Sequence, residues 1–255
     1  MEELKGKSAL VTGAALRIGR AVALALADHG VNVVVHYRNS KADAEKVAAD
    51  IHARGAQAWT VRGDLAEPAE VEAIFRSAVA AAGPLDILVN SASMFPKDTL
   101  RAAPLESFFE NINVNALAPL VLARRFAGAF APLVEGKGRR GAIINFLDSR
   151  ITDYDSAHTA YHLSKIALFA LTRMLSLEYA PQVRVNAVAP GLILPPPGED
   201  ESYLERLAST NPLNTFGGLS DITEAVLFLL RSDFVTGQVL FVDGGRHMRG
   251  SVYGL

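Results

Sequence analysis

Short apolar runs alternate with longer amphipathic segments along almost the whole chain of 255 residues. The short runs are rich in β-branched residues and are predicted strands: 7–12, 32–36, 57–64, 85–90, 141–146, 183–190 and 238–245. The longer segments are predicted helices: 18–30, 41–55, 71–83, about 105–134, 159–180 and 220–230. Strands that are apolar on both sides and alternate with helices form parallel sheets covered on both faces. We therefore predict one α/β domain over residues 1–255, doubly wound around a sheet of about seven parallel strands.

Composition narrows the class of protein. Half of the residues are apolar, the formal net charge is −2, and there is no cysteine. The lysines and arginines are scattered, which disfavours nucleic-acid binding, and no apolar run reaches the ~18 residues that a membrane span needs. The start, MEELKGKSALVTG, is charged and leads directly into a strand, so it does not resemble a signal peptide, and we expect a cytoplasmic location. The histidines show no metal-ligand spacing with carboxylates, and we predict no metal.

Polar residues and glycines follow the predicted strands. Right-handed crossovers bring the carboxyl ends of parallel strands to one edge of the sheet, and ligands bind there. This edge is predicted to carry Gly13, His36, Asp64, Asn90, Asp148 and Pro190.

The first strand leads into TGAALRIGRA (12–21), which predicts a Rossmann-type dinucleotide loop. Gly13 permits a tight turn, and Gly19 lets the next helix start close to the sheet with its amides facing a pyrophosphate. Arg17 stands where a third glycine is usual. It is either a surface arginine or, as we favour, a cation beside the phosphates or an anionic substrate.

The second strand ends in HYRNSK (36–41), with no acidic residue to hold the ribose 2′-hydroxyl of NAD. Arg38, Ser40 and Lys41 suit a 2′-phosphate instead, so we predict NADPH as the cofactor. The alternative is an ordinary basic loop before a helix capped by Asn39 or Ser40.

Tyr161 and Lys165 are four residues apart on a predicted helix, so both lie on one helical face. A free phenol has a pKa near ~10, and we expect the Lys165 cation to lower it enough for proton transfer. Asp148 ends the strand that precedes this helix. We expect its carboxyl group to face Tyr161; the alternative is that Asp148 caps a loop or pairs with Arg150.

Several motifs together resemble the short-chain dehydrogenase/reductase family: TGAALRIG, Asp64-Leu65, NSAS (90–93), Asn115 in NVNALAP, YHLSK (161–165), RVNAVAPG (184–191) and TGQVLFVDGG (236–245). The resemblance implies that Asn115 helps to hold a proton-relay water and that Lys165 contacts the nicotinamide ribose. The residues expected at the cofactor are Gly13, Arg17, Ile18, Gly19, His36, Tyr37, Arg38, Asn39, Ser40, Asp64, Leu65, Asn90, Ala92, Ser93, Tyr161, Lys165, Pro190, Gly191 and Leu192.

Two departures narrow the resemblance. Asp148 stands where the family generally has serine, and Arg17 where it has glycine. With HYRNS and NSASMF (90–95) they resemble the pteridine reductase branch, and DGGRHMRG (243–250) with APGLIL (189–194) looks most like the bacterial dihydromonapterin reductases. This resemblance implies that Phe95 stacks on a planar substrate. The residues expected at the substrate are Arg17, Ser93, Phe95, Asp148 and Tyr161.

A carboxylate at the place of Asp148 favours a ring C=N over a ketone. It would repel a developing alkoxide ~4 Å away by about 4 kcal/mol at an effective dielectric constant near 20. The leading prediction is therefore NADPH-dependent reduction of a pterin of the dihydromonapterin or dihydrobiopterin type, with dihydrofolate as a further candidate. The first alternative is a carbonyl reductase acting on a 3-oxoacyl group, a sugar or a quinone. The second is a non-catalytic nucleotide-sensing protein, against which the Tyr161-Lys165 pair argues.

Three further segments complete the predicted site. The region of about 192–215 is expected to be a substrate loop, with Pro and acidic residues suited to a solvated lid. Tyr154 and His158 could border the pocket or only pack. The resemblance implies a homo-oligomer, with a tetramer favoured, in which His247 or Arg249 reaches a neighbour's site.

Overall fold

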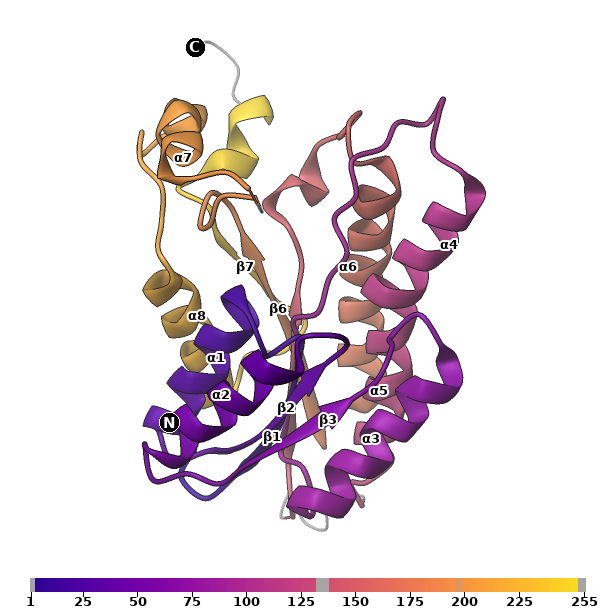
Figure 1. The fold of residues 1–255 in the computed structure, drawn as a ribbon, viewed down its shortest axis with the longest axis vertical. Coiled ribbons are helices and arrows are strands. Elements are labelled where there is room, and N and C mark those ends of the chain that lie inside the picture. Colours follow the sequence, from indigo (N-terminus) through magenta and orange to yellow (C-terminus); the bar gives the residue numbers. More distant parts are fainter. Residues whose placement is uncertain (1–2, 132–137, 197, 252–255) are drawn as a thin grey trace.

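The computed structural model describes residues 3–131, 138–196 and 198–251 (Figure 1). Its centre is one sheet of seven parallel strands in the order β3-β2-β1-β4-β5-β6-β7, which confirms the predicted fold class. The strands are β1 (Ser8–Thr12), β2 (Asn32–Tyr37), β3 (Ala58–Arg62), β4 (Ile87–Asn90), β5 (Gly141–Phe146), β6 (Val183–Pro190) and β7 (Val239–Val242). The order reverses between β1 and β4, so the carboxyl ends of these two strands border the crevice where ligands bind in such sheets.

Helices cover both faces of the sheet, and on each face an apolar core lies between the helices and the strands. On one face lie α1 (Arg17–Asp28), α2 (Lys41–His52) and α8 (Leu219–Arg231), at the left of Figure 1. On the other lie α3 (Pro68–Ala82), α4 (Leu105–Ile112), α5 (Ala118–Ala127) and α6 (Thr159–Tyr179). The first core includes Leu26, Val33 and Ile222, and the second Leu10, Leu88 and Phe126, all fully or almost fully buried. Because helices bury both faces of the sheet, its strands must be apolar on both sides, as the sequence shows.

The predicted helix over about 105–134 is not continuous. A π-helical turn, Asn113–Leu117, separates α4 from α5, which ends at Ala127; residues 132–134 lie outside the described chain. Pro119 lacks the N–H group that would reach the carbonyl of Asn115 four residues earlier, and its ring would clash there. The Ala118 amide bonds to the Asn113 carbonyl instead, which widens the turn.

Two strands end earlier than predicted. β3 ends at Arg62 because Gly63 and Asp64 turn into α3, and the Asp64 amide donates to Glu70 Oε2. β7 ends at Val242 because Gly244 and Gly245 have φ of 63° and 82° and turn the chain. The polar ends of both predicted strands therefore lie in loops at the carboxyl edge.

The segment expected as a substrate loop lies over this edge. It contains the short helix α7 (Glu201–Leu207) and the 3-10 turn Ala208–Thr210; Pro197 lies outside the described residues. A C-terminal 3-10 turn, Arg246–Ser251, lies beside α7 at the top of Figure 1. In the described part of the chain, no helix is long and apolar enough to span a membrane.

Candidate active site

The loop between β1 and α1 is packed so closely that only glycine fits at two positions. A Cβ atom on Gly13, where φ is 63°, would lie 2.8 Å from Ala92 Cα. A Cβ atom on Gly19 would lie 2.3 Å from the Gly13 carbonyl oxygen. The start of α1 therefore sits directly against the turn, with its amides at the carboxyl edge, as a pyrophosphate site requires.

His36 supports this loop from within. The Gly13 amide donates to His36 Nδ1 at 3.2 Å, so His36 Nε2 carries the proton and donates to the Gly63 carbonyl at 3.1 Å. Burial lowers the pKa of His36 to about 4 and keeps the ring neutral. Both ring nitrogens thus bond to the protein and hold the glycine loop in place, and the expected place of His36 at the cofactor stays a prediction.

A basic group lies at the start of α2, where the 2′-phosphate of NADPH is expected. Arg38 Nη1 is 3.7 Å from Asp64 Oδ2, and both side chains are partly exposed. Ser40 occupies the N-cap position of α2 but makes no side-chain cap bond, which leaves its hydroxyl free of that role. Lys41 pairs with Glu45 at 3.7 Å on the exposed face of the helix. Arg38 and the first amides of α2 are thus the groups that suit a phosphate.

Thr12, which the sequence analysis missed, joins the ends of β1 and β4. Its hydroxyl accepts from the amides of Ser91 and Ala92 at 3.0 and 3.1 Å. Asn90, also at this edge, donates to Asn145 Oδ1 at 2.8 Å and is buried. These bonds hold the β4 end next to Gly13, so Asn90, Ala92 and the glycine loop border one crevice.

A third close approach lies at the end of β6. A Cβ atom on Gly191 would lie 2.6 Å from Asp243 Cα, and the Gly191 amide donates to the Val242 carbonyl at 2.9 Å. Leu192 is buried, and its carbonyl accepts from Gly217 at 2.9 Å. Pro190, Gly191 and Leu192 thus form a fixed wall at the carboxyl edge, where the nicotinamide is expected.

Asn115 lies in the π-helical turn, but its side chain does not point to open space. Asn115 Oδ1 accepts from the Met94 amide at 2.9 Å, and Nδ2 donates to the Met94 carbonyl at 3.1 Å and to Ser164 Oγ at 2.9 Å. The predicted water-holding role is therefore not one for this side chain. Pro119 has no N–H group to donate to the main-chain carbonyl of Asn115, and the expected role of Asn115 in holding a water stays a prediction.

Asp98 fixes the start of the helix that carries Tyr161. Its Oδ1 accepts from the Thr159 amide at 2.6 Å, the Thr159 hydroxyl at 2.8 Å and the Ala160 amide at 3.2 Å. Burial alone would raise the pKa of the Asp98 carboxyl, but its bonds to Thr159 and Ala160 outweigh burial and lower it. A cap from a residue 61 positions away has no local sequence signal, which is why the sequence analysis missed it.

Replacing Asp98 by alanine is expected to lower the free energy of unfolding by about 1–2 kcal/mol at pH 7, the usual cost of a lost N-cap. Because the pKa of Asp98 is lowered by folding, its contribution is present at neutral pH and is lost as pH falls through the folded pKa. Urea unfolding at pH 7 and at low pH measures both effects. The exposed Asp233→Ala is the matched control; an equal loss in both variants would contradict the cap.

The predicted catalytic residues do meet. The Tyr161 hydroxyl donates to Asp148 Oδ2 at 2.8 Å, and Lys165 Nζ donates to the Phe146 carbonyl at 2.7 Å. Lys165 Nζ lies 5.6 Å from the centre of the Tyr161 ring. The loop after β5, which carries Asp148, and the first turns of α6 thus bring a phenol, a carboxylate and an amine to one point of the carboxyl edge.

The pKa of Tyr161 is shifted in the direction opposite to the one expected. Burial, and then the Asp148 carboxylate, raise it well above its usual value. Burial also lowers the pKa of Lys165 to about 8, against an opposing effect of Asp148. The prediction that Lys165 lowers the pKa of Tyr161 is therefore wrong for this structure: the phenol is protonated and is held as a hydrogen-bond donor.

Asp148 has two roles that the sequence analysis treated as alternatives. It faces Tyr161, and it also caps the 3-10 turn Ser149–Thr152 by accepting from the Arg150 amide at 2.8 Å. Arg150 Nε and Nη2 each donate to the carboxylate at 3.1 Å. Burial alone would raise the pKa of Asp148, but the bonds and charge of Arg150 outweigh burial, so the pKa is lowered and Asp148 is ionised.

Phe95 forms an aromatic wall beside Tyr161. Its ring stacks on His158 with centroids 4.1 Å apart and meets Tyr161 edge-on at 4.6 Å. Phe95 is 43% exposed, so it has surface left for a ligand. His158 therefore borders the site, whereas the side chain of Tyr154 is 98% exposed and packs against no part of it.

Arg17 and Ser93 occupy the rim. Arg17 has φ of 52°, a left-handed conformation uncommon for a residue with a side chain, and its Nη2 donates to the Pro195 carbonyl at 2.7 Å. Ser93 is exposed, and its hydroxyl donates to the Met94 carbonyl at 3.3 Å. Arg17 thus joins the glycine loop to the segment that follows β6.

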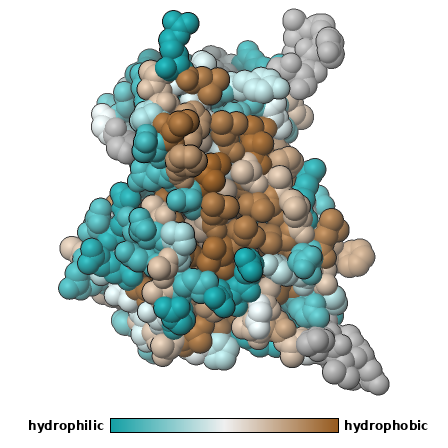
Figure 2. Space-filling view, turned by 90° about the vertical axis from the view of Figure 1, so that its right-hand side faces the viewer, coloured by the Kyte–Doolittle hydropathy of each residue, from teal (hydrophilic) through white to brown (hydrophobic). Residues whose placement is uncertain are grey.

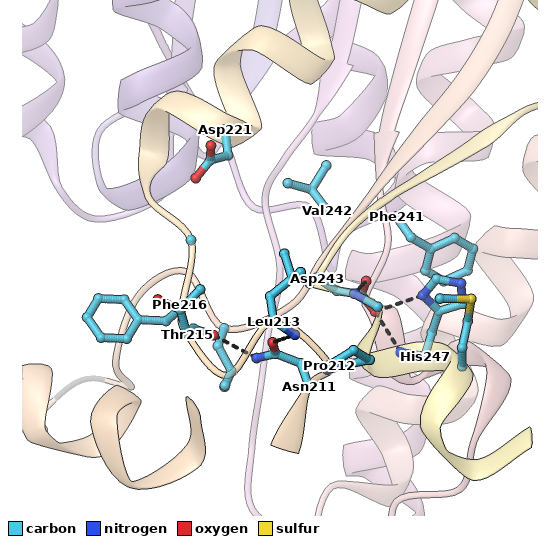
Figure 3. Close-up of a pocket in the computed structure, with 15 residues that line it drawn as sticks. Asn211, Pro212, Leu213, Thr215, Phe216, Asp221, Phe241, Val242, Asp243 and His247 are labelled. Carbon is cyan, nitrogen blue, oxygen red and sulfur yellow. Dashed lines mark hydrogen bonds and ion pairs between the residues drawn. The ribbon is translucent and has the colours of Figure 1, made fainter. Parts of the chain in front are cut away.

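A pocket of about 690 Å³ lies near this site, at the C-terminal side (Figure 3). The segment 211–217, the end of β7 and the C-terminal turn line it. His247 stacks on Phe241 at 3.9 Å and bonds to Asp243 at 2.9 Å, and the Arg249 side chain donates to the Ser209 carbonyl. These contacts are within one chain, so the expected role of His247 or Arg249 in a neighbour's site stays a prediction.

Comparison with known proteins identifies the family. The family model described as Enoyl-(Acyl carrier protein) reductase matches residues 13–247. Over 247 residues the chain is 32% identical to the 3-oxoacyl-(acyl-carrier-protein) reductase FabG of Staphylococcus aureus, covering 95% of this chain and 98% of that protein. Over 259 residues it is 34% identical to a short-chain type dehydrogenase/reductase of Picea abies, covering 95% and 93%. The chain belongs to the short-chain dehydrogenase/reductase family.

Solved structures of short-chain reductases agree with this and add the cofactor. FolM alternative dihydrofolate reductase 1 of Brucella canis, complexed with NADP, matches with a TM-score of 0.90 and 32% identity, covering 99% of this chain and 97% of that one. A blue fluorescent protein from a metagenomic library, in complex with NADPH, matches with a TM-score of 0.86 and 32% identity over 96% and 99%. The short-chain reductase described here is an NADP-dependent oxidoreductase, as predicted.

Proposed function

We propose that this enzyme reduces a pterin of the dihydromonapterin or dihydrobiopterin type to its tetrahydro form, with dihydrofolate as a further candidate. The observation that carries the proposal is the hydrogen bond from Tyr161 to the ionised Asp148 at 2.8 Å, beside the partly exposed ring of Phe95. A planar heterocycle can stack on Phe95 while its ring N–H groups donate to the carboxylate.

The charge of Asp148 argues for a ring C=N over a ketone. An unpaired carboxylate about 4 Å from a developing alkoxide would raise its energy by about 4 kcal/mol at an effective dielectric constant near 20, and pairing with Arg150 reduces this repulsion without removing the carboxylate as an acceptor. A ring nitrogen that takes up a proton develops no such negative charge. NADPH, when bound, supplies the hydride that goes to the ring carbon.

The protein's own groups would then move one proton. Tyr161 is protonated and delivers its proton to the ring nitrogen. Lys165, held by the Phe146 carbonyl, places a cation behind the phenol as the negative charge forms. Gly13, Gly19 and Arg38 would hold the dinucleotide, and Gly191 would let the nicotinamide end approach the sheet.

The similarity to the Brucella dihydrofolate reductases supports the pterin, because folates carry the same ring system. A second candidate also has an observation in its favour. The 3-oxoacyl reductase of Staphylococcus aureus is 32% identical over 95% of this chain, which favours a carbonyl reductase with a 3-oxoacyl substrate.

Replacing Asp148 by serine distinguishes the two candidates. For a pterin reductase, we expect kcat/KM with dihydropterins to fall about 10- to 100-fold, because the acceptor for the ring N–H groups is lost. For a carbonyl reductase, we expect the same variant to keep or gain activity, because the hydroxyl group can donate to the developing oxyanion. NADPH oxidation is measured over dihydropterins, dihydrofolate and ketones. The exposed Asp153→Ser is the control, and faster reduction of ketones than of dihydropterins by the wild-type enzyme would contradict the proposal.

A homotetramer in the cytoplasm stays a prediction. Apolar side chains gather on the side of the molecule where α4 and α6 lie (Figure 2), and Leu105, Phe109, Met174 and Leu177 are at least 63% exposed there. A continuous apolar surface of this kind is typical of an interface between subunits, which supports a homo-oligomer.

A further inference from the structure

Arg150 lies between two carboxylates in the wall of the site. On one side its Nε and Nη2 donate to Asp148 at 3.1 Å each. On the other its Nη1 donates to Asp155 Oδ2. Asp155 is only 9% exposed and is itself fixed by the Ala157 amide at 2.8 Å and by His158 Nδ1 at 3.0 Å. Arg150 therefore has one place to lie, and it joins the loop before α6 to the carboxyl end of β5.

This arrangement also fixes Asp148. Arg150 Nε bonds to Oδ1 and Nη2 to Oδ2, in the two-point contact that a planar guanidinium makes with a carboxylate. The Arg150 amide bonds to Oδ1 as well, so Oδ2 is the oxygen turned to the Tyr161 hydroxyl. Rotation of the carboxylate would break these bonds together.

We propose that Arg150 is a positioning residue of the reaction: clamped between Asp148 and Asp155, it holds the Asp148 carboxylate as the acceptor for the Tyr161 hydroxyl. This inference rests on the catalytic roles proposed above for Asp148 and Tyr161. Arg150 acts through Asp148.

The charge of Arg150 matters at two moments. Before reaction, it is the charge that keeps the half-buried Asp148 ionised; Tyr161 and Lys165 of α6 are the other titratable groups that face this carboxyl. During proton delivery, the phenolate forms beside a carboxylate, and Arg150, whose centre is 5.9 Å from the Tyr161 ring, offsets the repulsion. Arg150 itself faces Asp155 on its other side, and His158 lies behind Asp155.

The first test is Arg150→Met, assayed with NADPH and a dihydropterin. Burial without the cation raises the pKa of Asp148, so protonation of this carboxyl moves to higher pH. We expect kcat at pH 7 to fall about 10- to 100-fold. In a plot of kcat against pH, the acid limb, where kcat falls as Asp148 is protonated, should move up by about one pH unit or more. The KM for NADPH should stay within about twofold, because Arg150 does not lie at the nucleotide loop.

Further variants separate positioning from packing. Arg150→Lys keeps a positive charge but cannot make the two-point contact. We therefore expect its acid limb to lie close to that of the wild-type enzyme, and its kcat to lie between those of the wild-type enzyme and Arg150→Met. In the Asp148→Asn background, Arg150→Met should lower kcat by less than about twofold, because the group through which it acts is gone. Asp155→Asn weakens the contact that holds the far side of Arg150, so it should shift the acid limb to higher pH, but by less than Arg150→Met does. The exposed Arg76→Met, on α3, is the matched control.

Unfolding midpoints and NADPH binding report the integrity of each variant. An unchanged acid limb and kcat in Arg150→Met, or an undiminished loss in the Asp148→Asn background, would overturn the inference. If Arg150→Met does not fold, a wild-type kcat in Arg150→Lys together with an unchanged acid limb in Asp155→Asn would overturn it equally. Failure of the proposed function appears separately, as an active Tyr161→Phe enzyme or as a preference of the wild-type enzyme for ketones.

Discussion

Replacing Tyr161 by phenylalanine is expected to lower kcat at least about 100-fold, the typical contribution of a positioned general acid. The hydroxyl is the only part removed, and it is the group that bonds to Asp148 at 2.8 Å. The phenol is protonated because burial and Asp148 raise its pKa, so the wild-type enzyme holds a proton ready for the substrate. Phenylalanine keeps the ring that packs edge-on against Phe95.

NADPH binding separates this result from a loss of structure. Binding by Tyr161→Phe, measured by fluorescence, should stay within about fivefold, because a single hydrogen bond contributes about 1 kcal/mol. Tyr154→Phe is the matched control, since that side chain is 98% exposed. A Tyr161→Phe enzyme that retains most of its activity would rule out Tyr161 as the acid.

Replacing Gly19 by alanine is expected to weaken NADPH binding at least about 100-fold. The new methyl group would lie 2.3 Å from the Gly13 carbonyl oxygen, a backbone atom that can move away only by opening the turn that faces the pyrophosphate. Alanine gains up to about 1 kcal/mol in helix propensity, so the fold itself is expected to lose less than the binding site does.

Gly218→Ala is the matched control for this variant. A Cβ atom there would have 3.6 Å to its nearest neighbour, and φ of −117° suits any residue. Titration of both variants with NADPH, followed by fluorescence, measures the difference. Equal binding by the two variants would show that the close packing of Gly19 is not needed for the dinucleotide.

The sequence was sufficient for the fold because the decisive signals are local. Each strand is a short run that is apolar on both sides, and in each helix the apolar residues recur with the helical period. The seven-stranded parallel sheet therefore follows from the pattern alone. The break in the helix at Asn113–Leu117 was missed because an apolar period continues through it. Only Pro119 marks the break, and proline is also tolerated in the first turn of an ordinary helix.

The residues that make up the candidate site were predictable from the sequence. Their protonation states and side-chain orientations were less so. Tyr161, Lys165 and Asp148 meet because they follow β5 and begin α6, which the spacing indicates. The direction of the pKa shift of Tyr161 depends on burial and on the distance to Asp148, and neither is contained in the spacing. The same holds for His36, whose position at the end of β2 suggested a cofactor contact although its ring is turned into the protein.

The cap that Asp98 makes on α6 has a consequence for how activity arises during folding. With 21 residues, α6 is long enough to begin forming from local interactions alone. Its catalytic end is fixed only when Asp98, 61 positions earlier than Thr159, has closed onto it. Closing such a loop is an entropically costly and late event compared with helix formation. Helical content and the ability to turn over substrate should therefore return at different times in a refolding experiment, the second only with the long-range contact.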